Sequence, residues 1–211
     1  MQDFATLSVE EFLDQTAGRT PTPGGGSVTG MAGALACAMA HMVAAYSVGK
    51  NTDPEKKKRI EKVAVQLHRM DQLLRALITQ DAVAYSAMTE AAKSAKGDGA
   101  RAYQDAVLGA LSVPVEMAAL ASHTLTTLDQ FKQDAGRYLL SDLGIAAVLA
   151  DATARAARFT VLVNVAELAD PAQRRKLLSE MDVVLAHCAA HSESIEAFVT
   201  AHLEAPASSD R

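Results

Sequence analysis

The amino-acid sequence predicts an all-α protein, a single-domain helical bundle with long helices. Its 211 residues are enough to bury a sizeable core, and they require no second domain. Hydrophobic residues make up 49% of the chain but aromatic residues only 4%, and Trp is absent, so the core must consist mainly of Ala, Leu, Val and Met, which favour closely packed helices. Apolar residues recur at helical spacing. No segment shows the period-two pattern of a strand, although residues 160–163 have a strand-like composition.

The first helix is predicted to begin after Ser8, because Ser8-x-x-Glu11 is a capping box that satisfies two backbone amides. Gly18 is predicted to end it. Residues 21–27, PTPGGGS, contain two prolines and three glycines and are predicted to form a loop. An apolar helix follows over residues 28–48, where small residues at three- and four-residue steps allow another backbone to approach closely.

The apolar run at residues 28–48 is also long enough to cross a bilayer. Its composition argues against a membrane span, because Ala and Gly dominate it and Thr29, His41 and Ser47 interrupt it. Helices that are apolar on all sides also occur in protein interiors. We therefore predict a buried central helix and no membrane partner.

The later helices are marked by caps and helix breakers. Asp53-Pro54 predicts a helix start, and the absence of Gly and Pro from residue 55 to 96 predicts one helix of about 60 Å or two joined at a kink. A helix over residues 100–128 is predicted to bend at Pro114. The last two helices are predicted to start at Ser141-Asp142 and at Asp170-Pro171. The predicted organisation is one helical domain over residues 1–204 and a disordered polar tail over residues 205–211.

Charge and cysteine usage exclude several classes of protein. The net charge of -5 and the pI near 5.7 provide no basic field for a polyanion, so we expect no nucleic-acid partner. Cys37 and Cys188 lie far apart, and neither CxxC nor HExxH spacing occurs, so we expect no metal site. The acidic opening residues do not resemble a secretory signal. Together these features predict a cytoplasmic protein.

Three groups of residues are candidates for chemistry. The glycines of residues 21–27 either present backbone amides and a helix N-terminus to an anion, or form only a tight turn between helices. Asp81 lies four residues before Tyr85, among small apolar neighbours, and is either a solvated surface acid or an inward-facing acid, base or ligand anchor. Asp142 follows Ser141, and a helix cap accounts for both residues.

Four motifs occur in a fixed order over nearly the whole chain. They are PTPGGGSVTGMAGALACAMAHMV with SVGK after it (residues 21–43 and 47–50), DAVAY (81–85), VPVE (113–116) and SDLGIAA (141–147). This order resembles the formiminotransferase-cyclodeaminase family, specifically its all-helical cyclodeaminase domain. Asn164 matches a later family Asn, whereas Thr160 stands where relatives often carry Asn.

The resemblance implies a homodimer with a folate site in a cleft lined by these motifs. It implies proton transfer and pterin anchoring by Asp142 and Asp81, in either order, and a contact from Lys50 to a substrate carboxylate or to the one-carbon bridge. The implied substrate-binding residues are Pro23, Gly24, Gly25, Gly26, Ser27, Tyr85, Ser141 and Asn164. No cofactor is expected besides the tetrahydrofolate derivative that serves as the substrate.

Two family reactions share one reacting carbon, which is held between N5 and N10 of tetrahydrofolate. We expect methenyltetrahydrofolate cyclohydrolase activity, a hydrolase of one-carbon metabolism, because the chain carries no formiminotransferase domain to supply a formimino substrate. The alternative is formiminotetrahydrofolate cyclodeaminase activity, which releases ammonia. A second alternative is a non-catalytic helical binding protein, in which every motif serves as a cap, turn or core element.

Overall fold

A computed structural model describes residues 2–204 of the chain. Within these residues it has six α-helices and no strand, as the sequence predicted. The helices are α1 (Val9–Ala17), α2 (Gly25–Tyr46), α3 (Pro54–Ala92), α4 (Ala100–Phe131), α5 (Leu140–Val165) and α6 (Pro171–Glu204). Short 3-10 turns lie at Phe4–Thr6, Gly97–Gly99, Lys132–Asp134 and Arg137–Leu139. The predicted tail over residues 205–211 lies outside the described residues.

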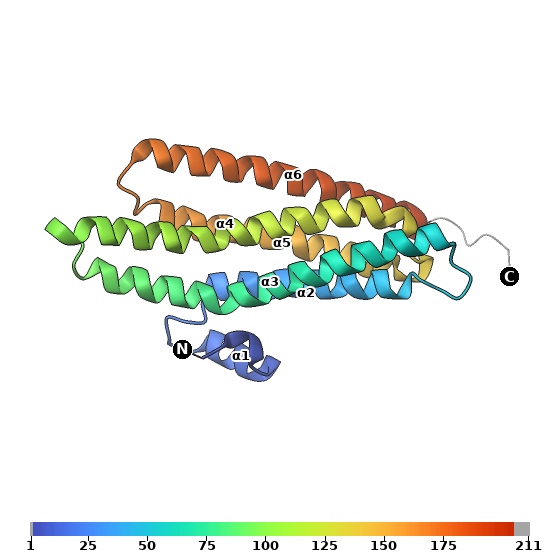
Figure 1. The fold of residues 1–211 in the computed structure, drawn as a ribbon, viewed down its shortest axis with the longest axis horizontal. Coiled ribbons are helices and arrows are strands. Elements are labelled where there is room, and N and C mark those ends of the chain that lie inside the picture. The colour runs from blue at the N-terminus through green and yellow to red at the C-terminus, as the bar shows by residue number, and fades with distance from the viewer. Residues whose placement is uncertain (1, 205–211) are drawn as a thin grey trace.

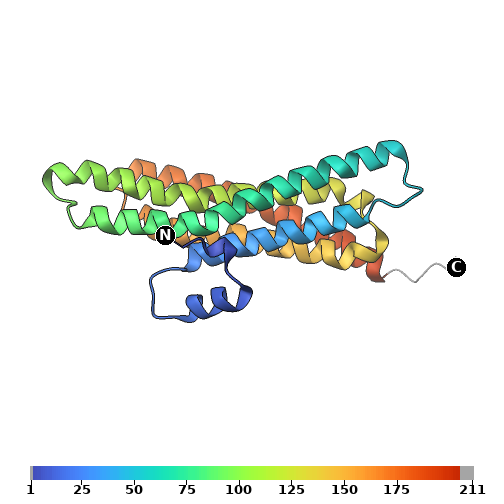
Figure 2. The same cartoon turned by 60° about the horizontal axis from the view of Figure 1, so that its bottom comes forward.

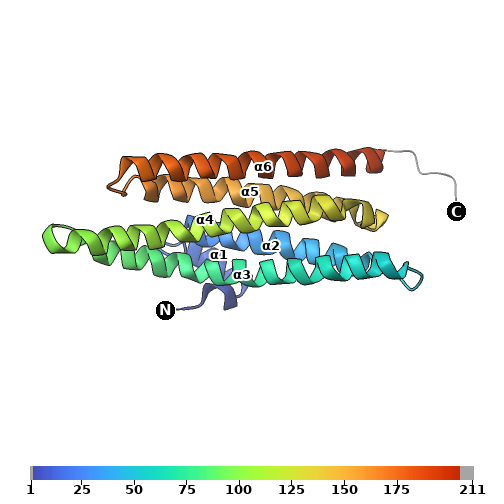
Figure 3. The same cartoon turned by 45° about the horizontal axis from the view of Figure 1, so that its top comes forward.

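Helices α2 to α6 lie side by side along one long axis, and each runs opposite to the one before it (Figure 1, Figure 3). The elongated bundle therefore has two ends. We call one the α4–α5 end; it contains the connections from α2 to α3 and from α4 to α5. Helix α1 packs on the outside of the bundle, close to the start of α2 (Figure 2). This arrangement separates the two termini of α2 by the length of a 22-residue helix.

Glycines in α2 allow it to pack tightly against α3 and α5. A Cβ at Gly30 would lie 3.0 Å from Ile78 Cγ1, and one at Gly33 would lie 2.9 Å from Leu74 Cδ2 and 3.0 Å from Thr153 Cγ2. These distances are shorter than van der Waals contact permits for most neighbours, so only glycine fits without a shift of the partner. The close approach expected from the small-residue spacing is confirmed.

The N-terminal segment is anchored to α3. Ser8 and Glu11 form the predicted capping box at the start of α1, and Gly18 caps its end. Phe4 and Phe12 are buried in a small cluster with Ile78 and other α3 residues. The Phe4 backbone amide also donates a hydrogen bond to Thr79 Oγ1 at 2.9 Å. These contacts hold the chain on α3 just before it enters the glycine-rich segment.

Several helix boundaries differ from the sequence prediction. Helix α2 starts at Gly25 and ends at Tyr46, so the last three residues of the predicted loop form the first turn of this helix. Helix α3 is a single helix that begins at Pro54, with Asp53 as its cap. The strand-like residues 160–163 are helical within α5, because packing on α2 and α4 overrides their β propensity.

The prediction that Ser141 and Asp142 cap α5 is wrong. The helix begins at Leu140, and its N-cap is Leu139, whose side chain makes no capping hydrogen bond. The 3-10 turn at Arg137–Leu139 runs directly into α5 and places both residues inside the first helical turn. Asp142 is therefore an acid near the positive end of the helix dipole, where a negative charge is favourable.

Two described helices are long and apolar enough to cross a membrane by length and composition, namely α2 and α4 with the turn that follows it. About half of the most apolar window of α2 is buried, and 44% of that of α4. Both helices carry core residues of the bundle, including Cys37 and Val43 of α2 and Leu125 of α4. A core helix of a bundle passes the same test, so the prediction of no membrane partner stays a prediction.

Candidate active site

A groove with a volume of about 340 Å³ opens where the N-terminus of α2 meets α3, α4 and α5. Its size falls within the range of small-molecule sites. Side chains and backbone from four helices and from the segment before α2 line it: Pro21, Thr22, Gly24, Gly25, Gly26, Asp81, Tyr85, Met88, Ala110, Phe159, Thr160, Val163 and Asn164. Asp81 is the only acidic side chain among these lining residues.

Asp81 lies directly against the first turn of α2. The Ser27 hydroxyl is 3.4 Å from Asp81 Oδ2, and it donates its shorter bond, 2.9 Å, to the Ile78 carbonyl one turn earlier on α3. Gly24, the N-cap of α2, supplies no side-chain capping bond. The carboxylate of a neighbouring helix thus occupies the place of a capping side chain, at the positive end of the α2 dipole.

Burial raises the pKa of Asp81 above its ordinary value, although the Ser27 hydroxyl and backbone amide act in the opposite direction and lower it. Desolvation disfavours the charged carboxylate more than these two donors favour it. A carboxyl group with a raised pKa in a groove is a candidate for proton transfer near neutral pH. The sequence alternative of a solvated surface acid is therefore excluded for this residue.

Gly26 is required by the position of this carboxylate. A Cβ at Gly26 would lie 1.9 Å from Asp81 Oδ1 and 2.6 Å from Oδ2. Neither carboxylate oxygen can move away from this Cβ without leaving the α2 N-terminus. The third glycine of the motif therefore has a steric role that a turn between helices would not by itself demand.

Gly26→Ala is expected to displace the Asp81 side chain and to lower turnover by about 10²-fold, the scale for losing a positioned acid or base. Gly109→Ala serves as the matched control, because a Cβ there meets nothing within 4 Å and alanine is the better helix former. Steady-state kinetics with both variants measures the difference. Full activity of Gly26→Ala would show that the carboxylate need not lie at the α2 N-terminus.

The wall opposite the glycines is formed by the end of α5. Asn164 is only 8% exposed, and its Nδ2 donates a hydrogen bond to the Ala110 carbonyl at 3.2 Å, which fixes the plane of the amide. Phe159 and Val163 are about 70% exposed, and Tyr85 of α3 is 43% exposed. The groove therefore combines one partly buried carboxylate and one oriented amide with exposed aromatic and apolar surface.

The structure brings together most of the residues predicted for the site. Gly24, Gly25, Gly26, Asp81, Tyr85 and Asn164 all line the groove, with Ser27 behind Asp81 and Pro23 buried in the segment before α2. The sequence analysis did not name Met88, Phe159, Thr160 or Val163. Helical spacing could have identified them, because Met88 continues the series from Asp81 and Tyr85, and Thr160 and Val163 share the face of Asn164.

Lys50, Ser141 and Asp142 do not lie at the groove of their own chain. Asp142 is 22 positions before Asn164 on α5, which corresponds to about 33 Å along the helix. Lys50 follows the C-terminus of α2, a whole helix away from Gly26. All three residues lie at the α4–α5 end, where the Ser47 hydroxyl accepts a bond from the Gly136 backbone amide at 2.8 Å. Within one chain, Asp81 and Asp142 therefore do not share a site, and their common role in folate chemistry stays a prediction.

A family model described as Formiminotransferase-cyclodeaminase matches residues 8–183, which is most of the chain and contains every residue of the groove. The chain belongs to this family. The resemblance read from the order of the four motifs is thereby confirmed.

The family includes named relatives of two lengths. A methenyltetrahydrofolate cyclohydrolase of Methylorubrum extorquens is 28% identical over 89% of this chain and 93% of its own length. The formimidoyltransferase-cyclodeaminase of Mus musculus is 28% identical over 83% of this chain, which spans only 34% of that relative. The crystal structure of a formiminotetrahydrofolate cyclodeaminase from Thermotoga maritima superposes with a TM-score of 0.87 at 28% identity, covering 94% of this chain and 98% of its own. The predicted cyclodeaminase fold is confirmed.

Proposed function

We propose that this family member is a methenyltetrahydrofolate cyclohydrolase that converts 5,10-methenyltetrahydrofolate to 10-formyltetrahydrofolate. The observation that carries the proposal is the partly buried Asp81 carboxyl group, which lines the groove beside the α2 N-terminus and has a raised pKa. The Methylorubrum extorquens relative, which this chain matches over nearly its whole length, supports the choice of reaction.

The reaction requires one group that accepts and returns a proton. Water adds to the cationic carbon between N5 and N10, and Asp81 takes one of its protons as the new C–O bond forms. The bond from this carbon to N5 then breaks, and Asp81 returns the proton to N5. The second water proton leaves to solvent, and its oxygen becomes the formyl carbonyl oxygen on N10. The raised pKa suits both halves of this cycle, because it makes the carboxylate a stronger base and keeps the acid available near neutral pH.

The rest of the groove suits a flat, partly polar ring. Tyr85, Phe159 and Val163 offer exposed apolar and aromatic surface on which a pterin can stack. The amide of Asn164 is held in one orientation and provides directional hydrogen bonding at the ring edge. These contacts would fix the reacting carbon relative to Asp81.

The homodimer implied by the family resemblance would complete this site. Folate carries anionic carboxylates, but within the described residues no Lys or Arg side chain lines the groove. The helices α2 and α5, which pack on each other, carry exposed apolar residues along their whole lengths: Val28, Leu35, Tyr46, Ile145, Val148, Phe159 and Val163. A second copy packed on these helices about a two-fold axis near their midpoints would place its α4–α5 end, with Lys50 and Asp142, beside this groove.

Cyclodeaminase activity is the second candidate, and the Thermotoga maritima structure favours it, because that chain is matched over 98% of its length. The same groove serves both reactions. In the cyclodeaminase reaction N10 attacks the formimino carbon, and ammonia leaves after receiving a proton. The two activities share Asp81 and differ in the leaving group.

Purified protein is expected to hydrolyse methenyltetrahydrofolate, seen as loss of its absorbance, without added metal, nucleotide or other cofactor. Chelator should leave the rate unchanged, because the proposed steps use only protein groups and water. A parallel assay with 5-formiminotetrahydrofolate measures ammonia release. Ammonia release without hydrolysis would replace the proposal by the cyclodeaminase, and binding without either turnover would favour the non-catalytic alternative.

The proposed location is the cytoplasm, in keeping with the two free, buried cysteines Cys37 and Cys188.

A further inference from the structure

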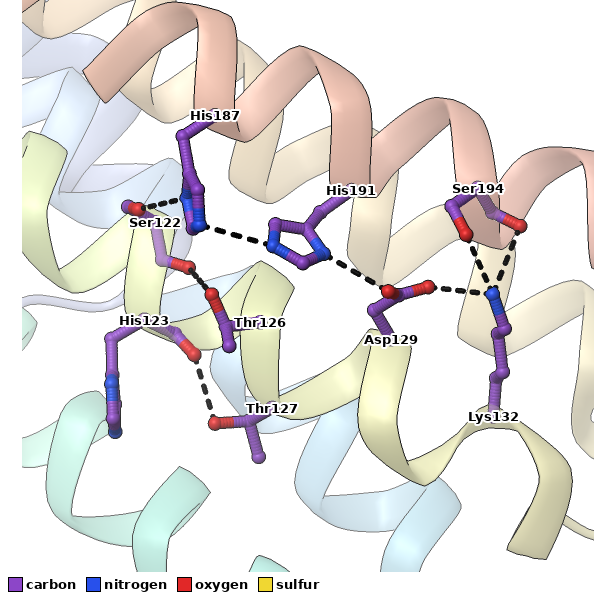
Figure 4. Close-up of polar contacts among 9 residues, drawn as sticks. All are labelled: Ser122, His123, Thr126, Thr127, Asp129, Lys132, His187, His191 and Ser194. Atoms are coloured by element: carbon purple, nitrogen blue, oxygen red, sulfur yellow. Dashed lines mark hydrogen bonds and ion pairs between the residues drawn. The ribbon is translucent and has the colours of Figure 1, made fainter. Parts of the chain in front are cut away.

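Two histidines on α6 face each other outside the groove. His187 and His191 lie one helical turn apart, and their Nε2 atoms are 3.1 Å apart (Figure 4). The rings are nearly perpendicular, with an interplanar angle of 71°. The sequence signal is the HxxxH spacing of these residues, so the sequence interpretation that no histidines are paired at HxxxH spacing is wrong. No step of the proposed reaction uses them.

Helix α4 holds both rings through their other nitrogens. His187 Nδ1 is 2.9 Å from the Ser122 hydroxyl, and His191 Nδ1 is 3.0 Å from Asp129 Oδ2 (Figure 4). An ionised carboxylate only accepts, so His191 donates through Nδ1–H, and the lone pair of the neutral ring then lies on Nε2. A histidine whose Nδ1–H is bound by a carboxylate and whose Nε2 is unprotonated is the form that binds metal ions in proteins.

The carboxylate of Asp129 is itself held in place. Lys132 Nζ lies 2.7 Å from Asp129 Oδ1 and 2.6 Å from Ser194 Oγ on α6. Both carboxylate oxygens therefore have a partner, Lys132 for Oδ1 and His191 for Oδ2. These contacts fix the carboxylate, so it can hold His191 in the tautomer with a proton on Nδ1.

The distance between the two Nε2 atoms suits a shared metal ion. Zinc binds imidazole nitrogen at about 2.0–2.1 Å, so two nitrogens 3.1 Å apart would subtend an angle of about 100° at the ion, close to the tetrahedral value. Ser122 can accept a bond from His187 Nδ1–H, which leaves a second lone pair on His187 Nε2. Without a metal ion, His187 Nε2–H donates a hydrogen bond to His191 Nε2 at this distance. A metal ion would replace this proton, and His187 would then carry its proton on Nδ1, toward Ser122.

We propose that His187 and His191 bind a borderline divalent transition-metal ion, such as Zn²⁺, through their Nε2 atoms, with Asp129 orienting His191. Within residues 2–204 no group of three or more His, Cys, Asp or Glu side chains is placed to hold a metal ion, so water would complete the coordination. Cys188 does not contribute, because its side chain is fully buried in the core. A site with two protein ligands and open positions exchanges its ion readily.

This site is separate from the groove. Ser122 follows Ala110, a groove residue on α4, by 12 positions, which corresponds to about 18 Å along the helix. A metal ion at His187 and His191 is therefore compatible with a chelator-insensitive reaction, and its binding can be measured independently of turnover.

Calorimetric titration of ZnCl₂ into metal-free, untagged full-length protein tests the proposal. One ion per chain is expected to bind, and zinc should shift the ring NMR signals of His187 and His191 but not those of His123 and His202. The double variant His187→Ala/His191→Ala is expected to lose binding, and Asp129→Asn to weaken it by about 10- to 100-fold, the usual effect of losing an outer partner of a ligating histidine. The double variant His123→Ala/His202→Ala serves as the matched control, because both residues are exposed histidines outside the pair.

Two results would overturn the proposal. Zinc binding that survives in His187→Ala/His191→Ala would place the ion elsewhere, for example at His41 and His68, whose ring centroids are 5.7 Å apart. Unchanged affinity in Asp129→Asn would show that any exposed pair of histidines binds equally well and that the carboxylate does not build the site. Circular dichroism of each variant verifies that the helices remain, and His191→Gln replaces His191→Ala if the latter unfolds.

Discussion

Asp81→Asn is expected to lower turnover of methenyltetrahydrofolate by about 10²-fold or more while the protein remains folded. Asparagine retains an oxygen that accepts from the first turn of α2, so the packing around Gly26 and Ser27 is preserved. It cannot accept and return a proton. Steady-state kinetics should therefore show a fall in kcat with little change in KM, whereas a merely structural Asp81 would leave both unchanged. Asp14→Asn, at an exposed acid of α1, is the control.

The stability of this variant provides a second measurement. The pKa of Asp81 is raised in the folded state, so protonated Asp81 stabilises the fold relative to the unfolded chain. This contribution is fully present below pH 3.8, the ordinary pKa of the group, and it is lost as the pH rises through the folded-state pKa. At neutral pH the wild type therefore bears the desolvation penalty of a partly buried charge that Asp81→Asn lacks. The variant should melt at or above the wild-type temperature at pH 7, and the difference should shrink toward pH 4. Lower stability at pH 7 together with full activity would reverse our assignment.

Asp142→Asn is expected to lower turnover by a similar factor, although Asp142 lies about 33 Å along α5 from Asn164 in the groove of its own chain. In the proposed homodimer each groove is completed by the α4–α5 end of the other copy. The substitution removes a charge near the start of α5, which by itself changes stability by only about 0.3–1 kcal/mol. A large loss of turnover without unfolding would thus point to a role at the partner's site.

Mixing the two inactive variants tests the shared site directly. A dimer of one Asp81→Asn chain and one Asp142→Asn chain has one groove with both substitutions and one with neither. Random exchange of subunits makes half of the dimers mixed, so about a quarter of the wild-type activity should return. Sedimentation should show a dimer at micromolar concentration. A stable monomer, an active Asp142→Asn, or no recovery on mixing would each contradict the shared site.

The sequence by itself determined the local elements, because their signals lie within a few residues of each other. Ser8 and Glu11 cap α1 from three positions apart, and Asp53 precedes Pro54 at the start of α3. Such contacts form in any chain that reaches the helical conformation, so residue types at fixed spacing are sufficient to predict them. The order of the motifs determined the family in the same way.

The start of α2 was decided only by tertiary structure. The sequence of residues 21–27 reads as a loop, yet Gly25 to Ser27 are helical, because Asp81, more than fifty positions later, occupies the α2 N-terminus. The same contact explains why Asp81 is a groove residue and why its pKa is raised. A search for caps near the helix start cannot find a carboxylate supplied by another helix.

Tertiary structure also decided which polar residues share a site. One groove contains Asp81, Asn164 and the α2 glycines, whereas the α4–α5 end contains Lys50 and Asp142. The reason is that antiparallel helices of 22 to 39 residues bring some distant segments together and hold others a full helix length apart. His191 gains its partner Asp129 from across the α4–α6 contact for the same reason. The spacing of residues along one helix specifies which of them share a face, and only the packing of helices specifies what that face meets.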